Sequence, residues 1–217
     1  MKATAALREL ADLTASQWGM ATSAQAARLG IGRLELSRLA ASGHLERLGH
    51  GVYRATAAPV DPREGIKAIW LSINPGSTVD ERLFRRPFDA VVSGSAASWL
   101  LEAGDLVPEP YEYTTPTRRF TQRTDLTYRT RMLPEDSVTI REGLPVTTFE
   151  QTIADLVETH IDHSLIADVI ADVPNLDRAR LADLLAPLAS RYGHSPGDGR
   201  ALLADLDQSP RKRRYAH

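Results

Sequence analysis

The sequence lacks cysteine and lacks any long apolar run. Without cysteine, the chain has no disulfide, no thiolate nucleophile and no cysteine-ligated metal site. No apolar stretch approaches the roughly 18–20 residues that a membrane-spanning helix needs. Residues 1–18 carry Arg8, Glu9 and Asp12, which interrupt the apolar segment that a secretory signal requires. Together these absences predict a cytoplasmic protein that makes no membrane contact.

The distribution of charge is more informative than its total. The 217 residues have a net charge of -2, and the length favours two domains. Residues 1–58 carry seven Lys/Arg against four Asp/Glu, whereas residues 135–210 carry five against fourteen. The chain then ends in the basic run "RKRR". A basic first part and an acidic last part predict two different partners.

Residues 1–58 have the pattern of three helices followed by a hairpin. "TAALRELADLTASQW" has apolar residues at helical spacing, and Thr22 with Gln25 has the spacing of a capping box that opens a second helix. Gly30 ends that helix, and "IGRLELSRLAASG" supplies a third. "HLERLGHGVYR" reads as a hairpin turned by Gly49 and Gly51. This order predicts a winged helix-turn-helix DNA-binding domain.

The candidate DNA contacts lie on the third helix and on the hairpin. In such domains the second helix of the pair enters the major groove, where arginine can pair with guanine. Residues on the wing would meet phosphates or the minor groove. Related small modules also bind protein, and surface arginines are often simply solvated. The candidates are Arg33, Glu35, Ser37, Arg38, Arg47, His50 and Arg54.

The rest of the chain predicts a second domain. Residues 59–65 contain two prolines and read as a linker, residues 66–208 as an α+β domain, and residues 209–217 as a basic, disordered tail. "YEYTTPTRRF" and "TDLTYRTRMLP" are the clearest strands, and Thr148 with Gln151 repeats the capping-box spacing before a helix. The fold class is therefore α+β: an N-terminal winged helix-turn-helix followed by a larger mixed α/β domain that ends in helices.

A group of arginines in this second domain has two interpretations. It could bind phosphate or an acidic partner surface, or it could be an ordinary solvated sheet face. The acidic helices beyond residue 135 could likewise dock on a basic partner or be solvated. The arginines are Arg118, Arg119, Arg123, Arg129 and Arg131.

No catalytic residue, metal site or cofactor is predicted. "VSGSAAS" lacks the second glycine of the G-x-S-x-G nucleophile elbow, and a serine between a strand and a helix is usually a cap. His160 and His163 share a helix face, but they lack the H-E-x-x-H spacing of zinc enzymes. These patterns favour a protein that is not an enzyme.

Residues 15–160 resemble the AbiEi family, the antitoxins of abortive-infection (type IV) toxin–antitoxin pairs. The stretches that carry this resemblance are "GMATSAQAARLGIGRLELSRLAASGHLERLGHGVYR", "AVVSGSAASWLLEAGDLVPEPYEYTTPTRR" and "GLPVTTFEQTIADLVE". One departure is Gln151, which stands where many relatives have arginine before the "TixDL" motif.

The resemblance implies an antitoxin that counters a nucleotidyltransferase-like toxin and represses its own operon. Its DNA site would be an inverted repeat in its promoter, occupied by two copies, whether the free protein is a monomer or a dimer. Direct contact with the toxin does not follow from the resemblance. Two alternatives remain: a stand-alone regulator whose C-terminal domain senses a ligand, and an enzyme with a DNA-targeting domain.

Overall fold

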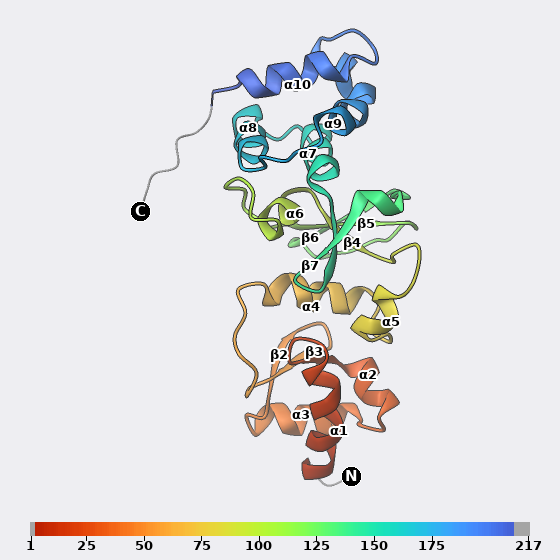
Figure 1. The fold of residues 1–217 in the computed structure, drawn as a ribbon. Coiled ribbons are helices and arrows are strands. Elements are labelled where there is room, and N and C mark those ends of the chain that lie inside the picture. Colours follow the sequence, from red (N-terminus) through yellow and green to blue (C-terminus); the bar gives the residue numbers. More distant parts are fainter. Residues whose placement is uncertain (1–2, 211–217) are drawn as a thin grey trace. The chain divides into compact units, whose positions relative to one another are not determined.

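The computed structural model describes residues 3–210 and divides into two compact units between Asp89 and Ala90 (Figure 1). This division differs from the expected one, which gave the first domain residues 1–58, a linker residues 59–65 and the second domain residues 66–208. The difference arises because the two helices that follow the hairpin pack within the first unit.

The first unit begins with three helices and three short strands. The helices are α1 (Ala3–Ala15), α2 (Ser23–Arg28) and α3 (Arg33–Ala41), and the strands are β1 (Met20–Thr22), β2 (Leu45–Gly49) and β3 (Val52–Ala55). The strands form an antiparallel sheet in the order β1-β3-β2. Leu10, Ile31, Leu36, Leu39 and Leu45 share one apolar core. This arrangement fits the expected winged helix-turn-helix, with β1 as an added strand.

Local signals in the sequence explain where these elements begin and end. The capping box at the start of α2 is present: Gln25 N–H donates to Thr22 Oγ1 at 3.0 Å, and Thr22 N–H donates to Gln25 Oε1 at 2.8 Å. Gly30 follows α2 with φ +77°, the left-handed conformation that glycine adopts most readily. Gly51 also has a positive φ, and a Cβ there would lie 2.7 Å from Ser23 Oγ. Both the backbone conformation and the lack of space for a Cβ therefore favour glycine at position 51.

Helices α4 (Glu64–Ile73) and α5 (Val79–Leu83) complete the first unit. Gln25 Nε2 donates to Ser77 O at 2.8 Å, and Arg28 pairs with Glu81 at 3.1 Å. Arg82, only 1% exposed, lies 3.3 Å from the centre of the Trp70 ring and pairs with Asp89 at 2.8 Å. Contacts of Gln25 and Arg28 thus hold the segment after the hairpin against α2, and contacts of Arg82 join residues 70–89 to one another.

The second unit is built on a five-stranded mixed sheet. Its strands are β4 (Val91–Ser93), β5 (Tyr111–Thr115), β6 (Leu126–Thr130), β7 (Val138–Arg141) and β8 (Leu144–Thr147), in the order β6-β5-β4-β8-β7. The pairs β5–β6 and β4–β8 are parallel, and β4–β5 and β7–β8 are antiparallel. Helix α6 (Gly94–Leu100) follows β4 directly, and a 3-10 turn, η1 (Glu135–Ser137), precedes β7.

Helices occupy the rest of the second unit (Figure 1). They are α7 (Phe149–Glu158), α8 (His163–Ala171), α9 (Arg178–Leu185), the 3-10 segment η2 (Ala186–Tyr192) and α10 (Gly199–Gln208). A second apolar core joins them through Ile153, Leu156, Ile166, Leu181 and Leu202. The predicted fold class is thus confirmed: α+β, with a larger mixed domain that ends in helices.

The second capping box forms only in part. Gln151 N–H donates to Thr148 Oγ1 at 3.5 Å, as expected for an N-cap. The Gln151 side chain, however, donates to Asp155 Oδ1 at 3.0 Å and does not close the box. This correction matters because Asp155 lies in a buried ion-pair cluster.

The sequence also predicted a basic tail and no contact with a membrane. The basic run "RKRR" falls in residues 211–217, which lie outside the described residues. Within residues 3–210, none of the helices has the length and apolarity needed to cross a membrane.

Candidate nucleic-acid interface and a buried ion-pair cluster

The outer side of α3 carries most of the candidate DNA contacts. Leu36 and Leu39 point into the core, with 1% and 2% of their surface exposed. The helical period then leaves Arg33, Ser37 and Arg38 exposed, and Glu35 half-buried. The structure therefore brings two arginines and a serine onto one accessible helix surface.

The hairpin carries two more of the candidates. Arg47 and His50 are exposed on β2 and in the turn between β2 and β3. Because Leu39 of α3 and Leu45 of β2 share the first apolar core, the hairpin is packed against α3. We call Arg33, Ser37, Arg38, Arg47 and His50 the α3–wing surface.

Arg54 does not belong to this surface, contrary to the sequence-based expectation. It is 6% exposed, and its guanidinium pairs with Glu46 Oε2 at 2.5 Å and with Glu64 Oε2 at 2.6 Å. It also donates to Ala58 O at 2.9 Å. Strand alternation puts Arg54 on the same buried side as Val52, and this period of two was the available sequence signal. Its charge is already matched, so Arg54 anchors α4 and has no free charge for phosphate.

Two arginines of the second unit are also committed to carboxylates. Arg129 and Arg131 lie on one face of the chain at β6, as their spacing predicted. Arg129 Nη1 lies 2.5 Å from Glu158 Oε2, and Arg131 Nη1 donates to Asp155 Oδ1 at 2.8 Å. Arg131 also pairs with Glu158. Of the two interpretations that the sequence left open for these arginines, phosphate or partner contact remains a prediction, and the structure shows that carboxylates of α7 pair with both.

A fifth charged residue completes what we call the ion-pair cluster, defined as Glu112, Arg129, Arg131, Asp155 and Glu158. Glu112 Oε2 lies 3.6 Å from Arg129 Nη2, and Glu112 also accepts a hydrogen bond from the Ser95 N–H. Gly94 has φ +58°, and a Cβ there would lie 2.3 Å from Glu112 Oε1. Thus glycine at this position admits the carboxylate to the start of α6.

The cluster holds three carboxylates and two guanidinium groups. Burial raises the pKa of Glu112, and the charge of Arg129 opposes that rise. Burial likewise raises the pKa of Asp155, which is 0% exposed, against the pull of Arg129 and Arg131. Asp155 Oδ2 has no hydrogen-bond partner among the described residues. The cluster is consequently one positive charge short of balance when all of its groups are ionised.

The other three arginines that were considered together in the sequence lie outside the ion-pair cluster. Arg123 pairs with Asp125 at 2.6 Å, and Arg119 is half-buried. Arg118 is exposed, with its guanidinium 4.7 Å from the centre of the Phe120 ring. Of the five arginines considered together in the sequence, the structure leaves Arg118 as the most accessible.

Three of the residues considered for catalysis or metal binding take part in internal hydrogen bonds. Ser93 Oγ accepts a hydrogen bond from Thr114 Oγ1 at 3.0 Å, and Ser98 Oγ donates to Ala103 O at 2.6 Å. His160 Nδ1 lies 2.9 Å from the Tyr192 hydroxyl. Among residues 3–210, no group of three or more His, Asp or Glu is placed to hold a metal ion.

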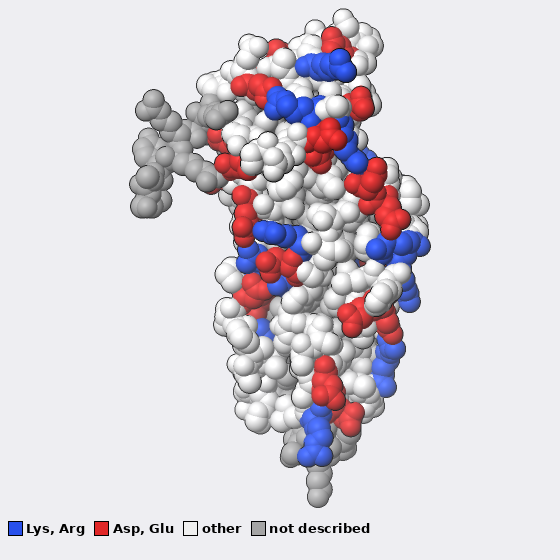
Figure 2. Space-filling view, viewed as in Figure 1, with Lys and Arg blue, Asp and Glu red and all other residues white. Residues whose placement is uncertain are grey.

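Charges of both signs are interspersed on the face seen in Figure 2, with blue and red side chains alternating. The acidic excess of residues 135–210 does not form one continuous red area in this view. An acidic docking face for a partner therefore gains no support from this side of the molecule.

A solved structure and a family model are similar to this chain. The crystal structure of the RV2827C protein from Mycobacterium tuberculosis matches with a TM-score of 0.54 and 16% identity, covering 95% of this chain and 83% of that one. This likeness concerns the fold alone. No curated protein matches the chain. The family model described as "Transcriptional regulator, AbiEi antitoxin" matches residues 8–56, so the segment that bears the α3–wing surface is a domain of the AbiEi antitoxin family.

Proposed function

We propose that this protein is an antitoxin that represses its own operon by binding promoter DNA through the α3–wing surface. The observation that carries the proposal is that the family match, residues 8–56, spans α3 and the whole hairpin with their exposed arginines. Arginine on a helix that fits the major groove can read guanine, and arginine on the wing can contact phosphate. The protein would act in the cytoplasm, where its promoter lies.

The second unit would oppose the cognate toxin, a nucleotidyltransferase-like protein. Support comes from the resemblance of "VSGSAAS" and "TTFEQTIADL" to the family pattern. Two copies would sit on an inverted repeat, one on each half-site.

The DNA half of the proposal is tested by removing three charges from the α3–wing surface. The variant Arg33→Ala/Arg38→Ala/Arg47→Ala should lose specific binding to the promoter fragment in fluorescence anisotropy. The matched control is Arg141→Ala/Arg191→Ala/Arg200→Ala, which removes three exposed arginines from the second unit. An equal loss of promoter binding in both variants would mean that binding depends only on the net charge of the protein, and it would contradict the proposed surface.

The antitoxin half is tested in cells. The neighbouring open reading frame is induced in a bacterial host with and without the full chain, and growth is measured. Rescue of a toxic neighbour supports the proposal, and co-purification then separates direct contact from indirect antagonism. A harmless neighbour, or toxicity that the chain does not relieve, would instead favour a stand-alone regulator.

A further inference from the structure

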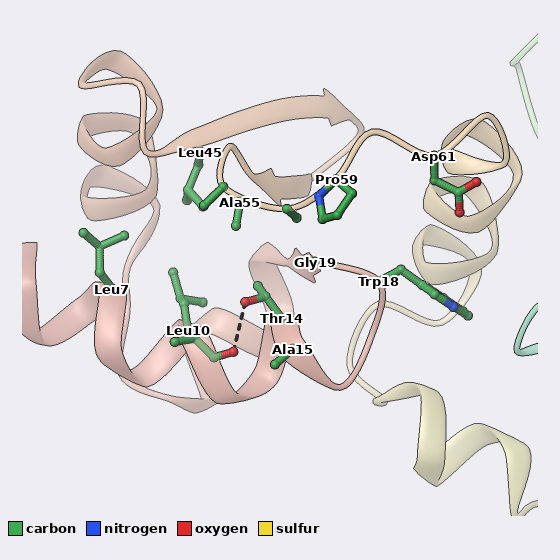
Figure 3. Close-up of a pocket in the computed structure, with 13 residues that line it drawn as sticks. Leu7, Leu10, Thr14, Ala15, Trp18, Gly19, Leu45, Ala55, Pro59 and Asp61 are labelled. Carbon is green, nitrogen blue, oxygen red and sulfur yellow. Dashed lines mark hydrogen bonds between the residues drawn. The ribbon is translucent and has the colours of Figure 1, made fainter.

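The first unit contains a pocket that the DNA-binding role does not use. Its volume is about 590 Å³, and it lies between α1 and the base of the hairpin (Figure 3). Leu10 and Ala15 of α1 form one wall, and Leu45 of β2 and Ala55 of β3 form the opposite wall. Trp18 and Asp61 lie at one end (Figure 3). The volume is within the range of about 300–1,000 Å³ typical of small-molecule sites.

Small side chains create this space. The lining includes five alanines, two on α1, one on β3 and two on the segment that follows β3, where larger apolar side chains would fill the cavity. Gly19 fixes one end, because it has φ +77° and a Cβ there would lie 2.3 Å from Ala58 Cβ. Trp18 also has a positive φ, +60°, which is uncommon for a residue other than glycine. The turn between α1 and β1 is thus held close to the segment after the hairpin.

Two polar side chains of the lining, Thr14 and Asp61, make hydrogen bonds within the first unit. Thr14 Oγ1 donates to Ala11 O at 3.1 Å. Asp61 accepts hydrogen bonds from Lys67 Nζ at 2.5 Å and from the Arg63 N–H at 2.9 Å. Burial alone would favour its neutral form, but these hydrogen bonds hold the pKa of Asp61 below its usual value. The pocket therefore offers an apolar surface with an ion pair, Asp61 with Lys67, at the end where Trp18 lies.

We propose that this pocket binds a small, uncharged molecule of one or two rings. An apolar molecule gains by leaving water for the leucine and alanine walls, and Trp18 offers it an aromatic contact. A charged ligand is disfavoured, because Asp61 is already paired with Lys67 at 2.5 Å and the apolar walls supply no counter-charge. Since α1 and both hairpin strands form the walls, a bound molecule contacts them together and stabilises the first unit by mass action. The inference does not depend on the proposed antitoxin role.

The test uses the full chain and the neutral two-ring dye N-phenyl-1-naphthylamine. Its fluorescence should rise to saturation with one site per chain, and it should raise the melting temperature. Ala15→Phe should weaken dye binding by about tenfold or more, because the ring fills the volume that the dye needs. Ala55→Leu narrows the pocket from the opposite wall and should act in the same direction. Ala204→Phe, at an exposed alanine of α10, is the matched control and should bind like the unaltered chain.

Three outcomes would overturn the proposal. One is dye binding without saturation. A second is equal dye binding in Ala15→Phe, Ala55→Leu and Ala204→Phe, provided that calorimetry shows all three folded. The third is a dimer that Ala15→Phe dissociates, because a second copy of the chain would then be the occupant. The anionic dye 1-anilinonaphthalene-8-sulfonate should bind more weakly than the neutral one.

Discussion

Two groups of arginines, one on α3 and the hairpin and one at β6, have opposite surroundings. Arg33, Arg38 and Arg47 of the first unit are exposed on α3 and the hairpin. Arg129 and Arg131 of the second unit have only 16% and 32% of their side chains exposed, and carboxylates of α7 surround them. The difference lies in elements distant in sequence, since α7 begins at Phe149 and supplies both Asp155 and Glu158. An arginine-rich stretch therefore indicates a binding surface only when no carboxylate from elsewhere in the fold covers it.

The largest expected effect comes from breaking the ion-pair cluster. Arg129→Met leaves Glu112, Asp155 and Glu158 with Arg131 as their remaining cation. Removing one partner of a buried ion pair typically costs about 3–5 kcal/mol, so the free energy of unfolding of the second unit should fall by that amount. Calorimetric unfolding of the full chain measures it. Arg200→Met, at an exposed arginine of α10, should change stability little.

A similar loss in Arg200→Met would show that any arginine substitution weakens the chain, and the cluster would lose its assigned role. Promoter binding should stay normal in Arg129→Met at temperatures where the variant is folded. Loss of specific DNA binding there would contradict the division between the two sets of arginines.

The next largest effect is expected at Arg54, a buried arginine of the first unit. Arg54→Met should lower the free energy of unfolding of the first unit by about 2–3 kcal/mol, because hydrogen bonds to charged groups are lost and Glu64 is left half-buried without its partner. The measurement is denaturant unfolding followed by tryptophan fluorescence. Affinity for promoter DNA below the unfolding transition should not change. Weaker binding by a stable variant would restore Arg54 to the DNA interface.

Arg38→Ala should show the reverse pattern. If this exposed residue of α3 reads a base, its loss weakens promoter binding by about 1–3 kcal/mol and relaxes specificity at one base pair. Stability should hardly change, because the side chain is exposed on α3. Binding to a set of single-base operator variants measures both effects. Unchanged affinity and unchanged base preference would remove Arg38 from the interface.

A smaller effect is expected from the excess negative charge of the ion-pair cluster. Burial raises the pKa of Glu112 above its ordinary value of 4.5, although Arg129 and the Ser95 N–H oppose the rise. The folded chain then holds a proton at pH values where the unfolded chain has lost it. Stability contributed by this group is therefore full below pH 4.5 and is lost as the pH rises through the raised pKa.

Glu112→Gln should reduce this dependence, which for one proton is at most about 1.4 kcal/mol per pH unit. Unfolding free energies between pH 4 and pH 8 would be compared with those of the unaltered chain. Asp155, whose pKa is also raised by burial, should leave part of the slope in place. A variant with the full original slope would exclude Glu112 as a source of it.

Local signals of the sequence predicted much of the fold. The capping box at Thr22, the turn glycines and the apolar period of α3 depend on neighbouring residues, and each was confirmed. β1 and β7 were not predicted; strands of three or four residues carry little periodic signal, and β3 was recognised through the glycine turn before it. The position of the boundary was also missed, because it depends on tertiary contacts such as Arg54 with Glu64 and Gln25 with Ser77. Tertiary contacts also decide which arginines are exposed: carboxylates of α7, distant in sequence, pair with Arg129 and Arg131, and the sequence around these arginines does not show this.

The smallest expected effect comes from Arg47 on the hairpin, and it distinguishes phosphate contact from base reading. An arginine that neutralises one phosphate releases about one counterion, so Arg47→Ala should reduce the salt dependence of binding by about one unit in slope. The affinity for specific and random DNA should fall by the same factor. Arg47→Lys keeps the charge and should keep the slope. A change of base preference in Arg47→Ala would mean that the wing reads sequence. The assignment of base reading to α3 and of phosphate contact to the hairpin would then be wrong.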